Sequence, residues 1–354
     1  MQPLSGLSVL DFSTLLPGPM ATLMLAEAGA DVLKIERPGG EDMRRFPPRF
    51  GEASAAYAVL NRGKRVIFED LKDPGALERL RPRIEAADVL VEQFRPGVME
   101  RLGFGYEALS RINPRLIYCS ITGYGQDGPR AAEAGHDLNY QAVTGLLGLA
   151  PGRAEAPAVP AALAADIAGG SMPAVINILL ALRQRDLTGA GCRLDIAMAD
   201  AMFTFGWLAL AQGHASGRFP APNEGMLHGG LPRYGVYATA DGRFLAVGAL
   251  EEKFWTTFCD ALELPQALRR DHVDPDATRA AVAAIIRSEP AATWARRLGP
   301  LDCCCTVVAS LEEALADPHF RARGLFDAQV SEPGGRSIPA AVLPIAPAFR
   351  QDGG

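Results

Sequence analysis

Short apolar segments alternate with helix-patterned segments in the first third of the chain. Residues 7–13, LSVLDFS, have the pattern of a buried strand, and PMATLMLAEAG predicts a helix with Pro19 in its first turn and Gly29 after its end. Further strands are predicted at residues 31–36, 65–71, 88–94 and 115–122, with helices at about 75–87 and 97–112. Apolar strands separated by helices form mostly parallel sheets that are covered on both faces, so we expect an α/β fold.

The pattern changes after residue 229. Apolar helical stretches near residues 139–149 and 161–183, and a helix from about 196 to 214, precede a predicted hairpin in YGVYATADGRFLAVGAL. Helices at about residues 251–262, 276–288 and 291–298 follow. A chain of 354 residues is long for one core. We expect a large α/β domain over residues 1–197, a linking helix and loop over 198–228, and a small α+β domain over 229–324.

Charge and composition exclude some classes of function. The net charge is −6, whereas nucleic-acid binding generally needs a basic face, so we expect no nucleic-acid partner. The start, MQPLSGLSVLDFS, lacks the basic and long apolar regions of a secretory signal. The six cysteines include the run at residues 303–305 but no CxxC spacing. We therefore expect free thiols in a reducing cytoplasm and no metal site.

One glycine pattern matches part of a dinucleotide-binding fingerprint. Gly123, Gly125 and Gly128 form G-x-G-x-x-G after a predicted strand. Pro129 and Arg130 follow in place of an apolar helix, and the strand is not the first of its sheet. The pattern therefore favours a sharp loop over a nicotinamide or flavin site. Such a loop at the carboxyl end of a strand is still where α/β proteins bind ligands.

Asp166 is the only ionisable residue in residues 156–182. Gly169, Gly170 and Pro173 interrupt this stretch, which fits a buried core helix better than a membrane span. Burial raises the pKa of a carboxyl toward neutrality, and such a group can exchange protons or attack an electrophile. Asp166 can equally cap a helix by accepting backbone N–H bonds. The two roles are compatible.

His136 lies in a predicted loop after a strand, in the segment AEAGHDLNYQ. An isolated histidine more often has a structural role than a catalytic one, because its ring can fill many structural roles. Asp137 follows it directly, but neighbours in sequence usually point apart. The residues alone therefore leave open whether His136 is a reagent and which group orients it.

Basic residues gather at turns near the ends of the predicted strands. Most arginines lie on a solvated surface, and that interpretation stays open here. Basic turns that follow successive strands can also converge on a phosphate-bearing ligand at one edge of a sheet. The residues are Arg37, Arg44, Arg45 and Arg49, then Arg62, Lys64 and Arg65, and finally Arg95.

Several long segments, spread over nearly the whole chain, resemble the family III acyl-CoA transferases, and within them the α-methylacyl-CoA racemase branch. They include LSGLSVLDFSTLLPGPMATLMLAEAGADVLKIERPGGEDMRR, VLNRGKRVIFEDLK, ADVLVEQFRPGVMERLGFGYE, RLIYCSITGYGQDGPRAAEAGHDLNY, DIAGGSM, ADGRFLAVGALEEKFW and DPHFRARGLF. The resemblance implies a Rossmann-like large domain, completed by about residues 325–354, a smaller domain and an interlocked homodimer.

The same resemblance implies a ligand and its site. The ligand is a coenzyme A thioester, which is the substrate, so no separate cofactor and no membrane partner are expected. The active site would lie between the large domain of one chain and the small domain of the other. The positions that match those holding the phosphates of coenzyme A are Arg37, Arg62, Lys64, Arg65 and Arg95.

Three residues match the catalytic positions of the racemases. They are His136 in GHDxNY, Asp166 in D-x-x-G-G and Glu251 in VGAxE, which in that family hydrogen-bonds the histidine. Inversion at the carbon α to a thioester needs a proton acceptor on one face, a donor on the other, and hydrogen bonds to the enolate oxygen. We expect His136 and Asp166 to exchange the protons, and backbone N–H groups near Ile167 and Ala168 to face the enolate.

CoA transfer is the alternative within the same superfamily. There the aspartate at the position of Asp166 attacks the thioester and forms a covalent intermediate, without dependence on the histidine. The racemases usually read LDGG before the small-domain hairpin, whereas this chain reads LHGG with His228. A non-catalytic binding protein is a third alternative. Retention of His136, Asp166 and Glu251 together argues against it.

Overall fold

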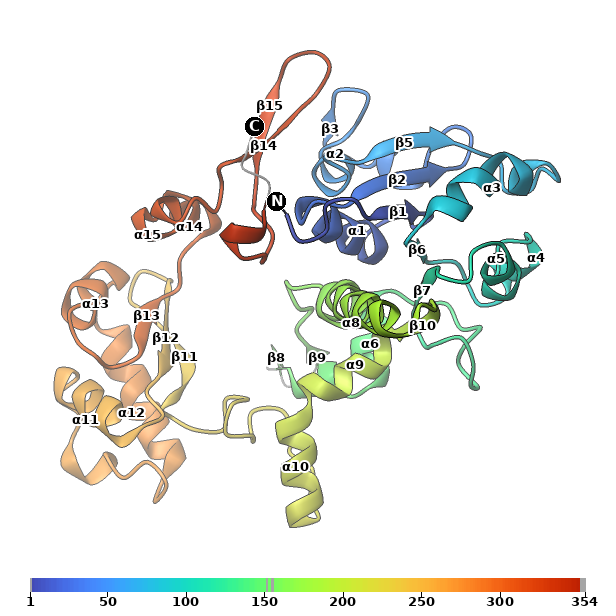
Figure 1. Ribbon diagram of the computed structural model, residues 1–354. Helices are drawn as coiled ribbons and strands as arrows, with labels where there is room; N and C mark the ends of the chain where they lie inside the picture. The colour runs from blue at the N-terminus through green and yellow to red at the C-terminus, as the bar shows by residue number, and fades with distance from the viewer. Residues whose placement is uncertain (1, 151, 154–155, 351–354) are drawn as a thin grey trace. The chain divides into compact units, whose positions relative to one another are not determined.

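The computed structural model describes residues 2–150, 152–153 and 156–350, which form two compact units. The first unit comprises Met1–Thr144, Ala161–Phe205 and Pro318–Gly354, and the second comprises Gly145–Pro160 and Gly206–Asp317. The C-terminal segment therefore belongs to the same unit as the N-terminal half of the chain (Figure 1).

The first unit is built on a six-stranded parallel sheet, as the alternating sequence pattern predicts. The strand order is β10-β7-β6-β1-β2-β5. Successive strands are added outward from β1 on one side and then outward from β6 on the other, which is the doubly wound arrangement of Rossmann-like folds. The strands are β1 (Ser8–Asp11), β2 (Asp31–Glu36), β5 (Arg65–Phe68), β6 (Val89–Glu92), β7 (Ile117–Thr122) and β10 (Cys192–Ala197).

Helices cover both faces of this sheet. Helices α1 (Pro17–Glu27) and α8 (Met172–Thr188) pack together, as do α3 (Ala76–Ala86) and α5 (Tyr106–Ile112). Alternate residues of each strand point to one face, so Leu10 and Phe12 share a core with Leu33 and Ile35. Shorter elements of this unit are η1 (Asp42–Arg45), β3 (Arg49–Phe50), β4 (Ala53–Ser54), α2 (Ala55–Leu60), α4 (Val98–Arg101), α6 (Asp137–Val143), the π-helix η2 (Ala164–Ser171), α9 (Met198–Phe205), α15 (Pro318–Ala322), β14 (Ala328–Ser331), β15 (Ser337–Ala340) and η4 (Pro347–Phe349).

Three of the predicted helices differ from the structure in their bounds. The helix predicted at residues 97–112 is two helices, α4 and α5, separated by a turn in which Gly103 has a φ of 83°. The helix predicted near 139–149 ends at Val143, and Gly145, with a φ of 81°, precedes the short helix α7 (Leu146–Leu149). The helix predicted from residue 196 is wrong at its start, because residues 192–197 form the edge strand β10.

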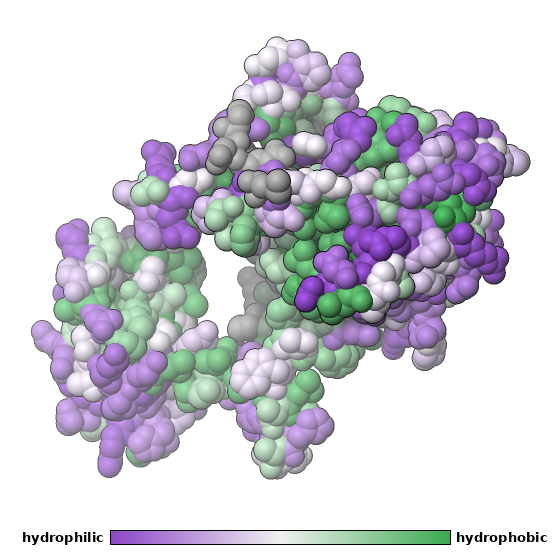
Figure 2. Space-filling model, in the orientation of Figure 1, coloured by the Kyte–Doolittle hydropathy of each residue, from purple (hydrophilic) through white to green (hydrophobic). Residues whose placement is uncertain are grey.

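The run of helix Ala164–Thr188 is long and apolar enough to cross a membrane by length and composition alone. In the structure it consists of η2 followed by α8, which packs against α1, β7 and β10 as a core helix does. Part of its surface is nevertheless apolar and exposed: Ile176, Leu179 and Leu180 are 56%, 44% and 63% exposed. Hydrophobic residues are visible at the surface over α8 in Figure 2.

The second unit contains the predicted hairpin and a third strand. Strands β11 (Tyr234–Ala238) and β12 (Phe244–Gly248) pair antiparallel, and β13 (Cys305–Val307) pairs with β12. Trp255, Phe258 and Trp294 are almost fully buried in its core. Its other elements are β8 (Gly152–Arg153), β9 (Ala156–Pro157), α10 (Trp207–Ser216), α11 (Glu252–Ala261), η3 (Gln266–Leu268), α12 (Pro275–Arg287), α13 (Ala291–Leu298) and α14 (Leu311–Ala316).

Candidate active site

The strand order places a crevice between β1 and β6 in the first unit. The connection after β1 leads to β2 on one side, and the connection after β6 leads to β7 on the other, so the two loops diverge. Doubly wound sheets bind their ligands at this point, beyond the carboxyl ends of the strands.

A cavity of about 800 Å³ lies there. This volume is within the range of small-molecule sites. Its walls come from segments that are far apart in sequence but meet at the ends of β1, β6 and β7. They include Thr14, Leu15, Leu16 and Pro17 after β1, Gln93, Phe94, Arg95 and Pro96 after β6, Gly123 after β7, and His136, Asn139, Tyr140, Leu163 and Asp166.

His136 occupies the N-cap position of α6 and lines the cavity. Its backbone N–H donates to Oδ1 of Asn139 at 3.0 Å, and its carbonyl accepts from the N–H groups of Asn139 and Tyr140 at 2.8 and 3.2 Å. The backbone is thus fixed, while the imidazole is exposed at the cavity. The exposed ring is free to meet a substrate.

Asp166 lines the same cavity from the π-helix η2. Burial, and to a lesser extent the negative charge of Asp137, raise the pKa of its carboxyl, while His136 opposes them by favouring the ionised form; the resulting pKa is about 6. A carboxyl with this pKa changes protonation near neutral pH, as a general acid or base must. The structure therefore brings the two predicted acid/base residues to one cavity.

Asp137 has a role that the sequence did not reveal. Its Oδ1 accepts from the N–H groups of Ala165 and Asp166 at 2.7 and 3.0 Å, and its Oδ2 accepts from Nε2 of Gln141 at 2.7 Å. This buried carboxylate therefore holds the start of the helix that carries Asp166, and no hydrogen bond links it to the imidazole of His136 among the described residues.

One of the two expected donors to an enolate, the N–H of Ile167, needs a correction. The N–H of Ile167 donates to the carbonyl of Leu163 at 3.0 Å, so it is engaged in the helix rather than free at the cavity. Ser171, at the end of η2, donates through its hydroxyl to the carbonyls of Pro17 and Asp166 at 2.8 and 3.2 Å. The π-helix is thus bonded to the first residue of α1.

The glycine pattern after β7 forms a loop, in agreement with the loop interpretation. Gly125 and Gly128 both have a φ of 88°, and no helix begins until Asp137. A Cβ atom on Gly123 would lie 2.6 Å from the ring of Tyr140, so a glycine is required for this close approach. Burial raises the pKa of the Tyr140 phenol to about 12, with a contribution from the charge of Asp166.

The predicted phosphate-binding residues do not form one group. Arg95 is exposed and lines the cavity. Arg37 follows β2, where it is exposed and pairs with Asp42 at 2.6 Å. Arg65 is the first residue of β5 and pairs with Asp31, the first residue of β2, at 2.6 Å, which places it at the amino ends of the strands.

Arg62 and Lys64 point inward. Arg62 pairs with Glu27 and donates to the carbonyl of Val59 at 2.8 Å. The ammonium of Lys64 is fully buried and donates to Asp11, to the carbonyl of Pro19 and to Asn61, at 2.9–3.0 Å. All three of its donors are used within the protein, an arrangement that gives Lys64 a structural role, and its contact with a phosphate stays a prediction.

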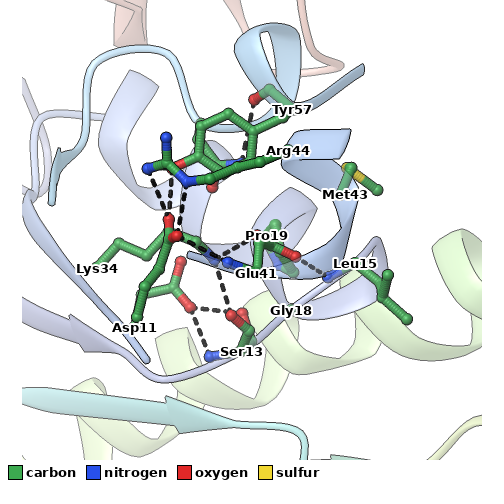
Figure 3. A network of polar contacts seen from close by, with 12 residues as sticks. Asp11, Ser13, Leu15, Gly18, Pro19, Lys34, Glu41, Met43, Arg44 and Tyr57 are labelled. Atoms are coloured by element: carbon green, nitrogen blue, oxygen red, sulfur yellow. Dashed lines mark hydrogen bonds and ion pairs between the residues drawn. The ribbon is translucent and has the colours of Figure 1, made fainter. Parts of the chain in front are cut away.

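Buried charges form a network at the end of β1 and β2, and Figure 3 shows Asp11, Lys34, Glu41 and Arg44 within it. Lys64 joins this network through its contact with Asp11. Asp11 accepts from Ser13, Thr22 and Lys64, and Lys34 pairs with Glu41 at 3.1 Å. Glu36, in turn, binds the guanidinium of Arg44 at 2.7 and 3.0 Å and accepts from the hydroxyl of Tyr57. The guanidinium of Arg44 thus pairs with a carboxylate of the protein itself and not with a phosphate.

Two further residues belong to the second unit. Glu251 is the exposed N-cap residue of α11, and its carbonyl accepts from the N–H groups of Phe254 and Trp255 at 3.0 Å. Its hydrogen bond to His136 stays a prediction. His228 is half-buried, and its Nδ1 has no hydrogen-bond partner within the described part of the chain. Among the described residues, no three His, Cys, Asp or Glu side chains are grouped so that they could hold a metal ion.

Known proteins resemble this chain over almost its full length. The α-methylacyl-CoA racemase of Homo sapiens is 36% identical over 361 residues, which cover 99% of this chain and 89% of the relative. The acetyl-CoA:oxalate CoA-transferase of Acetobacter aceti is 36% identical over 82% of this chain and 77% of the relative. The crystal structure of a CAIB/BAIF family protein from Brucella suis superposes with a TM-score of 0.83 at 29% identity, covering 97% of this chain and 92% of that one.

Racemases and transferases are thus similarly close in sequence, so identity alone does not choose between their reactions. The sequence model of CoA-transferase family III, which includes both kinds of enzyme, matches residues 4–350 of this chain. The doubly wound sheet, the cavity at its switch point and the relatives agree: this chain belongs to CoA-transferase family III.

Proposed function

We propose that this enzyme is a racemase or epimerase of 2-methylacyl-CoA thioesters. The observation that carries the proposal is the pair of residues His136 and Asp166, which line one cavity, where His136 lowers the pKa of Asp166 against the effect of burial. Proton removal and return at one carbon needs two such groups. A transferase needs only the carboxylate.

The mechanism assigns opposite duties to the two side chains. In one direction the carboxylate of Asp166 takes the α-proton while the protonated His136 delivers a proton to the other face, and in the reverse direction their duties exchange. A pKa of about 6 for Asp166 suits this exchange, because both of its protonation states are accessible near neutral pH. Glu251, from the small unit of a second chain, would orient the imidazole of His136 and stabilise its charged form.

Other parts of the proposal concern the ligand and the assembly. Arg95 would bind a phosphate group of the coenzyme A moiety, since it is the one predicted phosphate-binding residue that lines the cavity. No cofactor beyond the substrate is invoked, and the cytoplasm is the proposed location. The exposed apolar residues of α8 and Trp207 of α10, which is 63% exposed, support a homodimer that covers them.

CoA transfer is the second candidate. Asp166 is open to the cavity and could attack a thioester carbonyl. The succinyl-CoA:glutarate CoA-transferase of Homo sapiens is 36% identical over 76% of this chain, so the relatives support this reaction too. The dependence on His136 separates the two candidates.

The test is exchange of the α-hydrogen in D₂O. The protein is incubated with a 2-methylacyl-CoA of one configuration, without an acceptor acid, and the product is analysed by mass spectrometry and chiral separation. Deuterium at the α-carbon with loss of optical purity supports the proposal. No exchange, combined with CoA transfer to an added carboxylate, contradicts it.

Two variants sharpen this test. His136→Ala and Asp166→Asn should each lower the exchange rate by about 10²–10⁴-fold, the usual contribution of a positioned acid or base. His272→Ala is the matched control, because His272 is an exposed histidine that does not line the cavity. Full exchange by the His136→Ala variant would show that the residue is not one of the two bases.

A further inference from the structure

The loop between β1 and α1 contains a backbone conformation that a leucine rarely adopts. Leu15 has a φ of 60°, in the left-handed region where its Cβ crowds the following carbonyl. Such a conformation persists only where the surroundings hold it, and it occurs preferentially at functional sites. Leu15, Leu16 and Pro17 all line the cavity that contains His136 and Asp166.

A buried ion pair holds this loop by its backbone. Oε2 of Glu41 accepts from the N–H of Leu15 at 2.7 Å, and the ammonium of Lys34 donates to the carbonyl of Ser13 at 2.7 Å. Lys34 and Glu41 pair with each other at 3.1 Å, and their side chains are 0% and 1% exposed. The pair therefore holds the loop through hydrogen bonds on both sides of Thr14, to Ser13 and to Leu15, and Figure 3 shows these contacts.

Stability alone is a poor explanation for this pair. Removing two charges from water is costly, and apolar side chains of similar volume are often as stabilising as a buried ion pair. What an apolar pair cannot do is bond to the Ser13 carbonyl and the Leu15 N–H. Beyond the pair, Pro17, at which the loop enters α1, accepts through its carbonyl from the hydroxyl of Ser171, at the end of the helix that carries Asp166.

We propose that Lys34 and Glu41 are positioning residues, which hold Leu15 in its left-handed conformation and so fix the wall that residues 15–17 give to the acyl-CoA cavity. This inference rests on the proposed function, because it takes the cavity to be the thioester site. A wall that shifts by a fraction of an ångström misplaces the reacting carbon against Asp166. Such misplacement lowers kcat more than it weakens binding of the whole ligand.

The first test is Glu41→Gln. An amide in this place must turn its NH₂ group either to the Lys34 ammonium or to the Leu15 N–H, so one of the two contacts is lost. We expect kcat to fall about tenfold or more, with KM changed less than about threefold. The matched control is Asp88→Asn. The carboxylate of Asp88 also pairs with a cation, Arg185 at 2.9 Å, and accepts from a backbone N–H, that of Ser8 at 2.8 Å. Asp88 lies at the amino end of β6, at the opposite end of the strand from the cavity.

The second test removes the need for the pair. Glycine adopts a positive φ without the Cβ penalty. In the Leu15→Gly background, Glu41→Gln should therefore lower kcat by less than about threefold, although Leu15→Gly itself changes the wall. Equal losses in both backgrounds, or an equal loss of kcat in Asp88→Asn, would overturn the inference.

A third variant covers the case in which Glu41→Gln does not fold. The double substitution Lys34→Met with Glu41→Leu replaces the pair by apolar side chains, and such replacements are often neutral or stabilising. A folded protein with low kcat supports the inference, and a folded protein with the kcat of the unmodified chain overturns it. If the unmodified chain transfers CoA without exchanging the α-proton, the proposed function fails, and the same variants test the positioning role on CoA transfer.

Discussion

Two aspartates of the first unit differ in their environment more than in their burial. Asp11, the last residue of β1, is fully buried, and burial by itself raises the pKa of a carboxyl. The charges of Lys34 and Lys64 nevertheless hold the pKa of Asp11 well below its usual range, with a contribution from hydrogen bonds donated by Ser13 and Thr22. Asp166 is only half-buried, yet its pKa is raised to about 6 by burial and by the charge of Asp137.

The difference lies in the partners. The Asp11 carboxylate accepts from Ser13, Thr22 and Lys64, whereas the carboxyl oxygens of Asp166 accept no hydrogen bond from the described residues. Asp11 belongs to a closed network in which every charge has a fixed partner. Asp166 and Arg95 line an open cavity, and within the described part of the chain neither has an ion pair or hydrogen bond through its charged group. Paired charges hold the fold together, and unpaired charges are available to a ligand and its protons.

The largest expected effect comes from opening the closed network. Asp11→Asn removes one carboxylate and leaves two buried ammonium groups, those of Lys34 and Lys64, with only Glu41 to balance them. We expect the free energy of unfolding to fall by about 3–5 kcal/mol, the usual cost of breaking a buried ion pair. Urea unfolding followed by circular dichroism measures it. A loss below about 1 kcal/mol would mean that the network is as dispensable as a surface pair.

The next effect concerns two arginines. The comparison predicts that the KM for an acyl-CoA depends on Arg95, which lines the cavity, and not on Arg65, which is paired with Asp31. Arg95→Ala should raise the KM for an acyl-CoA about tenfold, because a charge-assisted hydrogen bond to a phosphate is lost. Arg65→Ala, which removes an exposed pair with Asp31, should leave the KM unchanged and alter stability by less than about 1 kcal/mol. Equal effects on KM would show that the pairing of Arg65 does not withdraw it from the ligand.

Sequence patterns predicted the central part of the fold better than its edge. Residues 31–36 and 115–122 were predicted as strands between helices, and they form inner strands of the sheet as expected. Residues 192–197, CRLDIA, alternate polar and apolar positions at the edge of the sheet. A run this short does not distinguish a strand from the first turn of a helix, and the structure shows a strand.

The site was predictable where chemistry follows from residue type, and not where it depends on side-chain direction. His136 and Asp166 were recognised from their motifs, and they line one cavity. The direction of the Lys64 side chain could not be predicted, because sequence does not show which way a long side chain turns, and its ammonium lies in the core. The contact of Asp137 with the N–H of Ala165 spans 28 residues, so no local pattern could reveal it.

The smallest expected effect tests the raised pKa of Asp166 through stability. Because the pKa of Asp166 in the folded protein, about 6, lies above its ordinary value of 3.8, the folded state holds the proton more tightly than the unfolded chain does. The contribution of Asp166 to stability therefore falls as the pH rises from about 4 to about 6, and the loss is complete above that range. Asp166→Asn keeps the shape but cannot ionise, so it escapes this loss.

We therefore expect Asp166→Asn to be more stable than the unmodified protein at pH 8 and to lose most of this advantage near pH 4. Solvent screening reduces the effect of a half-exposed group to on the order of 1 kcal/mol, or a few degrees in Tm. The control is Asp186→Asn, an exposed carboxyl of α8 outside the cavity, which should show no such gain. If Asp166→Asn instead loses stability at pH 8, then the Asp166 carboxylate is held by favourable partners, as Asp11 is, and the contrast between the closed network and the open cavity fails at its central residue.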